Sequence, residues 1–416
     1  SMPVFHRAVV SGLGIVAPNG IGLDEFWGSL LRNESGIDNI SRFDASEYPI
    51  RIAGEIKEFR VQDYVDGKVR PKRMARHTQL ALAATRLALQ DAGLESRDWR
   101  GQAGVPVIVG VSNGAVDVIE DGKQRLLERG PKRVSPYVVS ACQPHAVAVA
   151  MSELLGDRTR KLKLSTAWGA GLDGSGQAAE MVRRGRADLV ITGGADSATN
   201  PLTVASFSAA GMVPALNGED PSRVSRPFDL KRKGGIMAEG AGILIVERLE
   251  RAVERGVRPY MEIIGYGDSV DEDGAESASG LGVSMRIALA NCGWKADTID
   301  YVCAHGPSDR TIDRVETEQI KNVFGRRAFR IPVTSIKGAT GNPLSAAGPL
   351  EVAACGLIMR HGTVPPTTNY EYPDPQCDLD YVAGKPRYHD VSRAVVNLHG
   401  LGGGNTSMVL QRLDRL

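Results

Sequence analysis

The stretch "LSTAWGAGLDGSGQA" (164–178) has the layout of a turn that could hold a reactive side chain. Strand-like residues lead into a small-residue helix, and Trp168 lies at the turn between them. Backbone N–H groups and the dipole at a helix N-terminus stabilise an anion, so a cysteine there would be acidified to a thiolate. Tryptophan cannot act as a nucleophile, an acid or a base. We therefore predict that the turn is kept for the fold while its chemistry is absent.

Two cysteines elsewhere in the chain could supply a reactive thiol. Cys303 precedes His305 by two residues in a predicted strand, so both side chains point to the same face. Cys142 lies near His145 in "VSACQPH" and could line a pocket with it. Free cysteines more often pack as small hydrophobes, and we favour that role for both. Four other histidines are expected to lie at the surface or in packing contacts: His6, His77, His361 and His389.

Short β-branched runs alternate with helical runs, which predicts α/β layering. Buried strands are expected over 7–16, 105–112, 187–195 and 241–249. A helix is expected over 76–94, ended by Gly93.

The second half of the chain repeats the order of elements in the first. The stretches 261–269, 286–293 and 299–306 follow each other as strand, helix and strand, and 392–413 closes the chain with two strands around a glycine turn. We therefore predict two related halves, 1–255 and 256–416, that pack tightly against each other.

Composition describes an ordinary soluble globular protein. The 416 residues are 42% hydrophobic and 24% charged, with a net charge of +1, so no bulk attraction to nucleic acid or to a membrane is expected. No apolar run reaches the roughly 20 residues of a membrane span. The five dispersed cysteines form no CxxC pair and predict reduced thiols in a cytoplasmic protein. No metal site and no cofactor are expected.

Four longer stretches carry a resemblance to a known family. They are "VVSGLGIVAPNGIGLDEFWGSLLRNESGI" (9–37), "PLTVASFSAAGMVP" (201–214), "SRPFDLKRKGGIMAEGAGILIVERLERAVERG" (225–256) and "PPTTNYEYPDPQCDLDYV" (365–382). Over essentially its whole length the chain resembles the β-ketoacyl-ACP synthases of the thiolase fold. The resemblance implies a five-layered αβαβα architecture. In that family an elbow cysteine takes the acyl chain as a thioester, and two histidines help to decarboxylate a malonyl-ACP extender and polarise its carbonyl.

The resemblance places the family's catalytic positions unevenly on this chain. Trp168 stands where the cysteine is expected. His305 takes the first histidine position, but residues 307–309 replace the usual threonine-rich loop. Asn342 stands in place of the second histidine. Two further family positions are kept, Lys337 and Glu351.

The same resemblance points to an altered acyl pocket. Gly235 and Leu401 stand where the family usually has phenylalanines, and His399 neighbours the C-terminal glycine turn. Interiors are close-packed, so we expect the Trp168 ring to be largely buried in the space freed at Gly235 and Leu401, plugging the pocket.

A ketosynthase without a nucleophile resembles the chain-length factors of type II polyketide systems. That resemblance implies a subunit that does not condense alone, a heterodimer with a catalytic ketosynthase or else a homodimer, and contact with an acyl carrier protein. His305 and "PDPQCDLDYV" instead resemble an active synthase, so an active 3-oxoacyl-ACP synthase or another acyltransferase with a non-standard mechanism stays open. An acidic carrier protein could contact the basic runs 70–77, 158–163 and 231–233.

Overall fold

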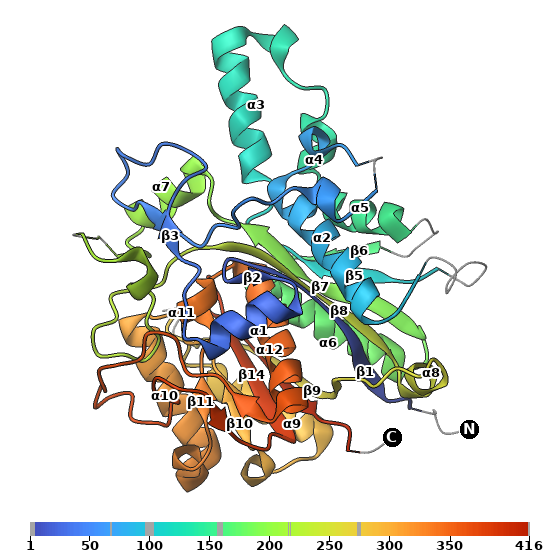
Figure 1. Cartoon of the computed structure of the whole chain (residues 1–416), viewed down its shortest axis with the longest axis vertical. Coiled ribbons are helices and arrows are strands. Elements are labelled where there is room, and N and C mark those ends of the chain that lie inside the picture. Colours follow the sequence, from blue (N-terminus) through green and yellow to red (C-terminus); the bar gives the residue numbers. More distant parts are fainter. Residues whose placement is uncertain are drawn as a thin grey trace.

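The computed structural model describes residues 5–66, 69–95, 104–155, 161–214, 216, 218–272 and 276–414, without the side chains of 161–163. Its centre is a mixed sheet that runs through both halves of the chain (Figure 1). The strands, from one edge to the other, are β6 (Lys161–Leu164), β5 (Val107–Gly110), β7 (Leu189–Ser197), β8 (Glu239–Arg248), β1 (Ala8–Ala17), β9 (Met261–Val270), β15 (Gly404–Gln411), β14 (Arg393–His399), β10 (Tyr301–Cys303) and β11 (Val333–Thr334). The short β2 (Gly20–Ile21) pairs with β1.

The strand order is the same in the two halves. The first half reads β1–β8–β7–β5–β6 outward from the middle, and the second reads β9–β15–β14–β10–β11. Within the described residues, each half contributes five strands to this sheet when β2 is left out. Outward from the middle, their order in both halves is first, last, fourth, second and third along the chain. The halves meet where Val9 and Val10 of β1 pair with the start of β9. This repeat is the one that the sequence pattern predicts, while the domain division at residue 255 stays a prediction.

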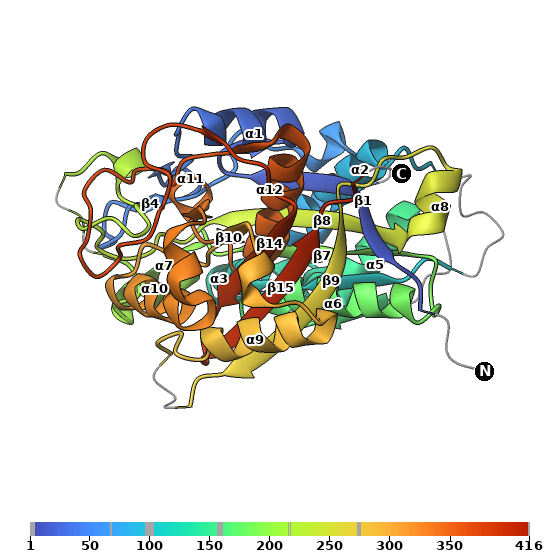
Figure 2. The same cartoon turned by 90° about the horizontal axis from the view of Figure 1, so that it is seen from below.

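Helices form three layers around the sheet (Figure 2). The central layer holds α6 (Ala170–Arg183) and α12 (Ala347–His361), which contact strands of both halves. On the outer side of the first half lie α2 (Arg76–Asp91) and α5 (Ala146–Leu155). On the outer side of the second half lie α9 (Leu281–Cys292) and α10 (Arg310–Phe324). The α/β, five-layered αβαβα prediction is confirmed.

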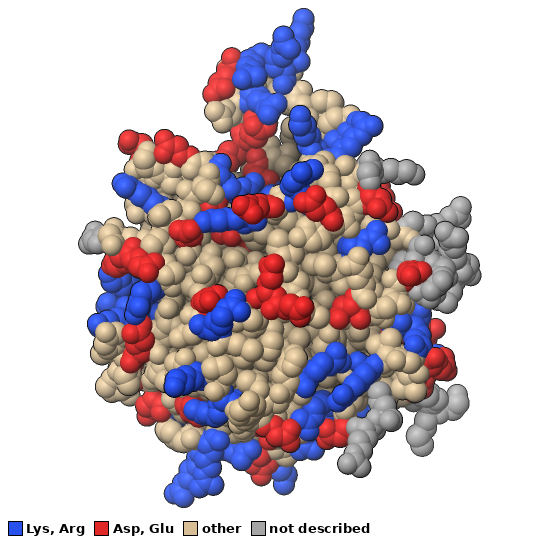
Figure 3. Space-filling model, viewed as in Figure 1, with Lys and Arg blue, Asp and Glu red and all other residues tan. Residues whose placement is uncertain are grey.

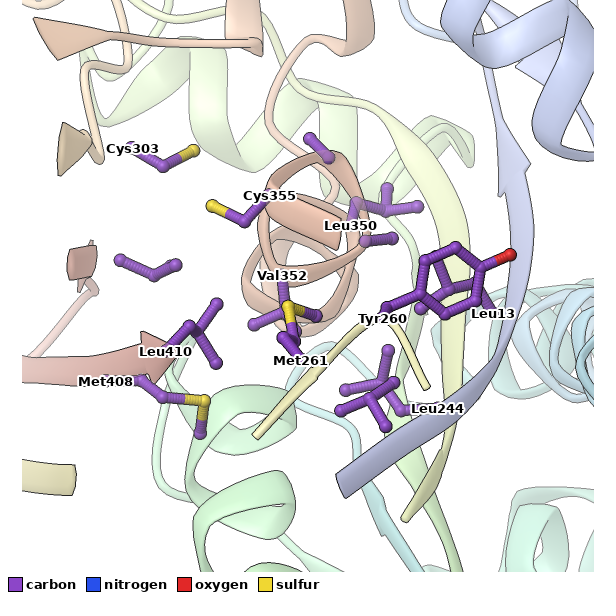
Figure 4. Close-up of a cluster of buried hydrophobic side chains, with 14 of the residues drawn as sticks. Leu13, Leu244, Tyr260, Met261, Cys303, Leu350, Val352, Cys355, Met408 and Leu410 are labelled. Carbon is purple, nitrogen blue, oxygen red and sulfur yellow. The ribbon is translucent and has the colours of Figure 1, made fainter. Parts of the chain in front are cut away.

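The largest hydrophobic cluster joins the two halves around α12 (Figure 4). Leu350 and Val352 of this helix pack with Leu13 and Leu244 from the first half and Met408 from the second. This core explains the tight packing that the sequence predicts. The four expected strands of the first half are confirmed as β1, β5, β7 and β8, and Gly93, with a φ of 66°, follows the end of α2.

One helix, α3 (Val116–Arg129), projects from the body beside α4 (Val138–Cys142) and α7 (Pro201–Ala209) (Figure 1). Large apolar side chains are exposed along this region: Ile119, Leu126, Leu127, Val139 and Leu202. The remaining elements are α1 (Leu23–Leu31), β3 (Asp38–Asn39), β4 (Ile52–Ala53), α8 (Leu249–Glu254), α11 (Lys337–Thr340), β12 (Thr363–Val364), β13 (Arg387–Tyr388) and several short 3-10 turns. Within the described ranges, no helix combines the length and apolar character needed to cross a membrane.

Candidate functional site

The turn at Trp168 has the strand–turn–helix form that its sequence predicts. Ala167 lies just before it with a φ of 63°, a left-handed conformation that costs an alanine about 1–2 kcal/mol. The helix α6 begins two residues after Trp168, behind Gly169. The C-terminal glycine turn packs directly against this elbow, because a Cβ on Gly400 would lie 2.9 Å from the Trp168 nitrogen. The elbow at Trp168 and the glycine turn at Gly400 are far apart in the sequence but together form one site.

The Trp168 indole is partly buried and packs against a small hydrophobic cluster, and its expected role as a plug of the acyl pocket stays a prediction. Its ring meets Phe207 of α7 edge-on, with centroids 6.3 Å apart and planes at 81°. A pocket of about 410 Å³ stays open beside the ring. Leu401, which is 43% exposed, lines this pocket, and its expected place in the acyl pocket stays a prediction. Gly235 does not, because it lies against the backbone of Pro307, whose oxygen would be 3.1 Å from a Cβ there.

Asp173 in the first turn of α6 anchors the elbow. The hydroxyl of Tyr266 donates to its carboxylate at 2.6 Å, that of Thr406 at 2.9 Å, and that of Thr166 donates as well. Burial raises the pKa of this carboxyl, against the effect of the three hydroxyl donors. Sequence reasoning missed Asp173, although a buried carboxylate five residues after the turn is the only acid in that helix start, "AWGAGLDGSG".

A second centre gathers around His305, which follows β10 and is 1% exposed. The Lys337 ammonium donates to the His305 carbonyl oxygen at 2.7 Å and lies 3.3 Å from its Nδ1. The same ammonium forms an ion pair with Glu351 of α12. The structure thus brings together His305, Lys337 and Glu351, as the resemblance implies.

Burial shifts the pKa values of the His305 imidazole and the Glu351 carboxyl. It lowers the pKa of His305 well below its ordinary value, and the positive charge of Lys337 and the nearby His399 lower it further. Burial also raises the pKa of Glu351 well above its ordinary value, although the Lys337 charge opposes the shift. Among the described residues, neither His305 Nε2 nor Glu351 Oε2 has a hydrogen-bond partner.

Asn342, at the second histidine position, is 2% exposed and is held by the backbone around it. Its N–H donates to the Ile236 oxygen at 2.8 Å, and its own oxygen accepts from Ala238 at 3.0 Å. Its Oδ1 accepts from the Leu344 nitrogen at 3.2 Å. An amide in this place shapes the turn and cannot exchange protons near neutral pH.

His399 lies beside His305 and does not line the pocket beside Trp168, and its expected place in the acyl pocket stays a prediction. The two imidazole rings meet edge-on, with centroids 5.8 Å apart. His399 Nδ1 is 2.9 Å from the Asn405 side-chain oxygen, and its Nε2 is 3.1 Å from the Glu276 carbonyl oxygen. These contacts fix the glycine turn that presents Leu401 to the pocket.

Glu316 of α10 holds the loop that carries His305, and sequence reasoning missed it. The backbone nitrogens of His305 and Gly306 donate to its two oxygens at 2.9 and 2.7 Å, and the Asn397 amide donates at 3.2 Å. Burial raises the pKa of the Glu316 carboxyl.

Neither candidate cysteine lines the pocket beside Trp168. Cys303 is fully buried in the core, and the neighbouring Cys355 thiol together with burial raises the pKa of its thiol well above the ordinary value. Cys142 is half-buried, His145 is exposed, and neither lines the pocket beside Trp168. The packing role favoured for Cys303 is confirmed.

The expected basic docking runs are only partly available. In 231–233 the central Arg232 is 3% exposed and bonded to Asp374 at 2.6 Å, which leaves Lys231 and Lys233 on the surface. In 70–77, Arg76 pairs with buried carboxylate Glu239 at 3.0 Å. The run 158–163 lies outside the residues whose side chains are described. Basic side chains instead gather at the projecting end of α3 (Figure 3): Lys123, Arg125, Arg129, Lys132 and Arg133.

Sequence models of two family domains match the chain, "Beta-ketoacyl synthase, N-terminal domain" over residues 6–252 and "Beta-ketoacyl synthase, C-terminal domain" over 260–371. The chain belongs to the β-ketoacyl synthase family. It is 37% identical to 3-oxoacyl-[acyl-carrier-protein] synthase 2 of Synechocystis sp., over 98% of both chains. It is 35% identical to the protein of that name from Staphylococcus aureus, over 98% of this chain and 99% of that one.

Solved ketosynthase structures match the fold closely. The ishigamide ketosynthase/chain length factor superposes with a TM-score of 0.91 at 30% identity, over 99% of this chain and 100% of that one. A type II polyketide acyl-carrier protein in complex with its ketosynthase gives a chain with a TM-score of 0.90 at 30% identity, over 98% and 100%. The thiolase-like ketosynthase fold of this chain is therefore established.

Proposed function

We propose that this chain is a ketosynthase-like subunit that does not condense acyl chains alone. In this proposal it acts as a chain-length-factor-like partner of a catalytic β-ketoacyl synthase in polyketide or fatty-acid biosynthesis. The observation that carries the proposal is the elbow itself: Trp168 holds the position of the acyl-accepting thiol, and its ring is fixed against Phe207. Without a nucleophile at this turn, no acyl-enzyme forms.

The second half of the site supports the same conclusion. Condensation in this family needs two histidines, and Asn342 in the place of one is held in backbone hydrogen bonds. Neither Cys303 nor Cys142 is placed to compensate. Lys337 still contacts both His305 and Glu351. In this proposal the chain carries no acyl group on which these residues could act.

Two surfaces support a partner of the same fold. Strand β6 lies at the edge of the sheet, where an unprotected strand invites pairing with another chain. The exposed apolar side chains of α3, α4 and α7 lie near the pocket, which Val116 and Leu202 line. We propose that a catalytic ketosynthase covers this region as a heterodimer and that the chain forms a homodimer in isolation. An acyl carrier protein would meet Lys231 and Lys233, which remain exposed.

An active 3-oxoacyl-ACP synthase with a non-standard mechanism is the second candidate. The observation that favours it is the 35–37% identity to curated relatives that carry that name. The two candidates differ in whether the isolated chain binds an acyl group covalently.

Intact mass spectrometry after incubation with labelled acyl-ACP tests the choice. We expect no adduct on the natural chain, and a thioester on Trp168→Cys, because the helix N-terminus lowers the pKa of a thiol. With malonyl-ACP added, Trp168→Cys alone should stay inactive, and activity should require Asn342→His as well. An acyl adduct or steady 3-ketoacyl-ACP production by the natural chain would overturn the proposal.

Co-expression with a cysteine-bearing ketosynthase tests the partner role. Native mass spectrometry should show a one-to-one complex, and changing Trp168 or Leu401 should change product length. If the two chains never associate and the partner makes the same products alone, the partner role fails.

A further inference from the structure

Two free thiols face each other in the hydrophobic core near His305, those of Cys303 and Cys355. Cys303 lies on β10 and Cys355 on α12, and their sulfur atoms point toward one another (Figure 4). Both residues are 0% exposed and belong to the same hydrophobic cluster. The proposed function uses neither thiol.

The two cysteines sit on the elements that carry the buried polar centre. Cys303 precedes His305 by two residues at the end of β10, and Cys355 follows Glu351 by one helical turn on α12. Lys337 connects His305 with Glu351. A covalent bond between the two sulfurs would therefore join the strand and the helix that position this centre.

We propose that Cys303 and Cys355 form a redox modification site, at which a peroxide converts the two thiols into one intramolecular disulfide. The Cys355 sulfur attacks hydrogen peroxide and breaks the O–O bond, which yields a sulfenic acid and one water. The Cys303 sulfur then attacks the sulfenic sulfur, the S–O bond breaks, and a second water leaves with the thiol proton. Overall, two thiols and one peroxide give one disulfide and two waters: sulfur is oxidised and peroxide oxygen is reduced.

Burial selects the oxidant and makes the reaction slow. The two thiols have no exposed surface, so a water-sized peroxide reaches them more readily than a bulky disulfide. The neighbouring Cys355 thiol and burial raise the pKa of the Cys303 thiol, so Cys303 is a poor first nucleophile. The rate is then set by transient opening between β10 and α12.

A disulfide between Cys303 and Cys355 would change the contacts of the nearby Lys337. Two sulfurs that are not bonded to each other lie farther apart than the roughly 2.05 Å of a disulfide, so α12 and β10 must move closer. The movement alters the Lys337 contacts to Glu351 and His305. A cross-link between residues 303 and 355 also constrains the unfolded chain, so the oxidised protein should unfold at a higher temperature.

A peptide map of the full-length chain tests the site. Cys142 and Cys292, both half-buried, are first changed to serine so that only buried thiols remain. The reduced protein is treated with hydrogen peroxide, denatured, alkylated and digested. We expect alkylated cysteines to fall from three to one, with a cross-linked peptide pair holding Cys303 and Cys355. The thermal midpoint should rise and return with dithiothreitol.

Two variants complete the test. Cys355→Ala should abolish both the cross-link and the rise in midpoint. The matched control Cys377→Ser removes another buried thiol and should leave both unchanged. The proposal is overturned if Cys303 and Cys355 stay alkylated after peroxide has consumed other thiols, or if each becomes a separate sulfinic acid. No acyl substrate enters this test, so its failure leaves the proposed function untouched.

Discussion

Replacing Lys337 with methionine tests how the polar centre is held together. The ammonium, on a side chain that is 1% exposed, pairs with Glu351, donates to the His305 carbonyl oxygen at 2.7 Å and lies 3.3 Å from Nδ1. Methionine keeps the length of the stem and removes the charge. Breaking a buried ion pair by removing one partner costs about 3–5 kcal/mol, because the other charge stays buried without compensation.

The expected shift in melting temperature follows from chain length. Unfolding entropy is about 2.1 cal/mol/K per residue, so the 416 residues give about 0.9 kcal/mol/K. A loss of about 4 kcal/mol then lowers the midpoint by about 4.5 °C. Burial already raises the pKa of Glu351, and removal of Lys337 raises it further. A raised carboxyl pKa means stability that is present at low pH and lost as pH rises, so Lys337→Met should be more destabilised at pH 8 than at pH 5.5.

Calorimetry and urea unfolding at both pH values measure the effect. The control is Lys57→Met, which removes a half-exposed lysine paired with Asp38 and should cost less than about 1 kcal/mol. The double variant Lys337→Met, Glu351→Gln should recover much of the loss, because no charge remains buried. Equal shifts for Lys337→Met and Lys57→Met, or a double variant as unstable as the single one, would refute the reasoning.

Two further outcomes follow from the same geometry. The pKa of His305 is lowered in the folded state, so the unfolded chain binds this proton first as pH falls below about 6.5; His305→Gln should reduce the acid loss of stability by up to about 1.4 kcal/mol per pH unit in urea titrations. Gly400→Ala should cost about 1–3 kcal/mol, because its Cβ would meet the Trp168 backbone at 2.9 Å. The control Gly404→Ala meets nothing within 4 Å, and similar melting temperatures for the two would count against a fixed elbow.

Sequence periodicity was enough to predict α/β layering and two related halves, because each half repeats the same order of strands and helices; the five-layered arrangement was implied by the family resemblance. The strands over 7–16 and 241–249 are continuous apolar runs, as expected for strands covered on both faces. The elbow at Trp168 was predictable for a local reason: a strand, a turn and small residues opening a helix follow one another directly.

Contacts between distant residues set the rest of the site. The orientation of the Trp168 ring depends on Phe207, and the anchoring of Asp173 depends on Tyr266 and Thr406 from the other half. One residue of the basic run 231–233 has a structural role, because Arg232 is buried and hydrogen-bonded to Asp374. Local sequence specifies residue type and spacing, but not which distant side chains fill the surrounding volume.

The elbow at Trp168 and the buried Lys337–Glu351 pair differ in how strongly the fold depends on them. Trp168 stands at the rim of an open pocket, half-buried, where a large ring is accommodated without displacing a buried charge. Lys337 and Glu351 are fully buried and depend on each other, so losing either alone leaves an uncompensated charge or an unsatisfied polar group. His305 is tied to the same lysine by its carbonyl oxygen. A substitution at the elbow is therefore expected to cost the fold less than the loss of one member of the buried Lys337–Glu351 pair.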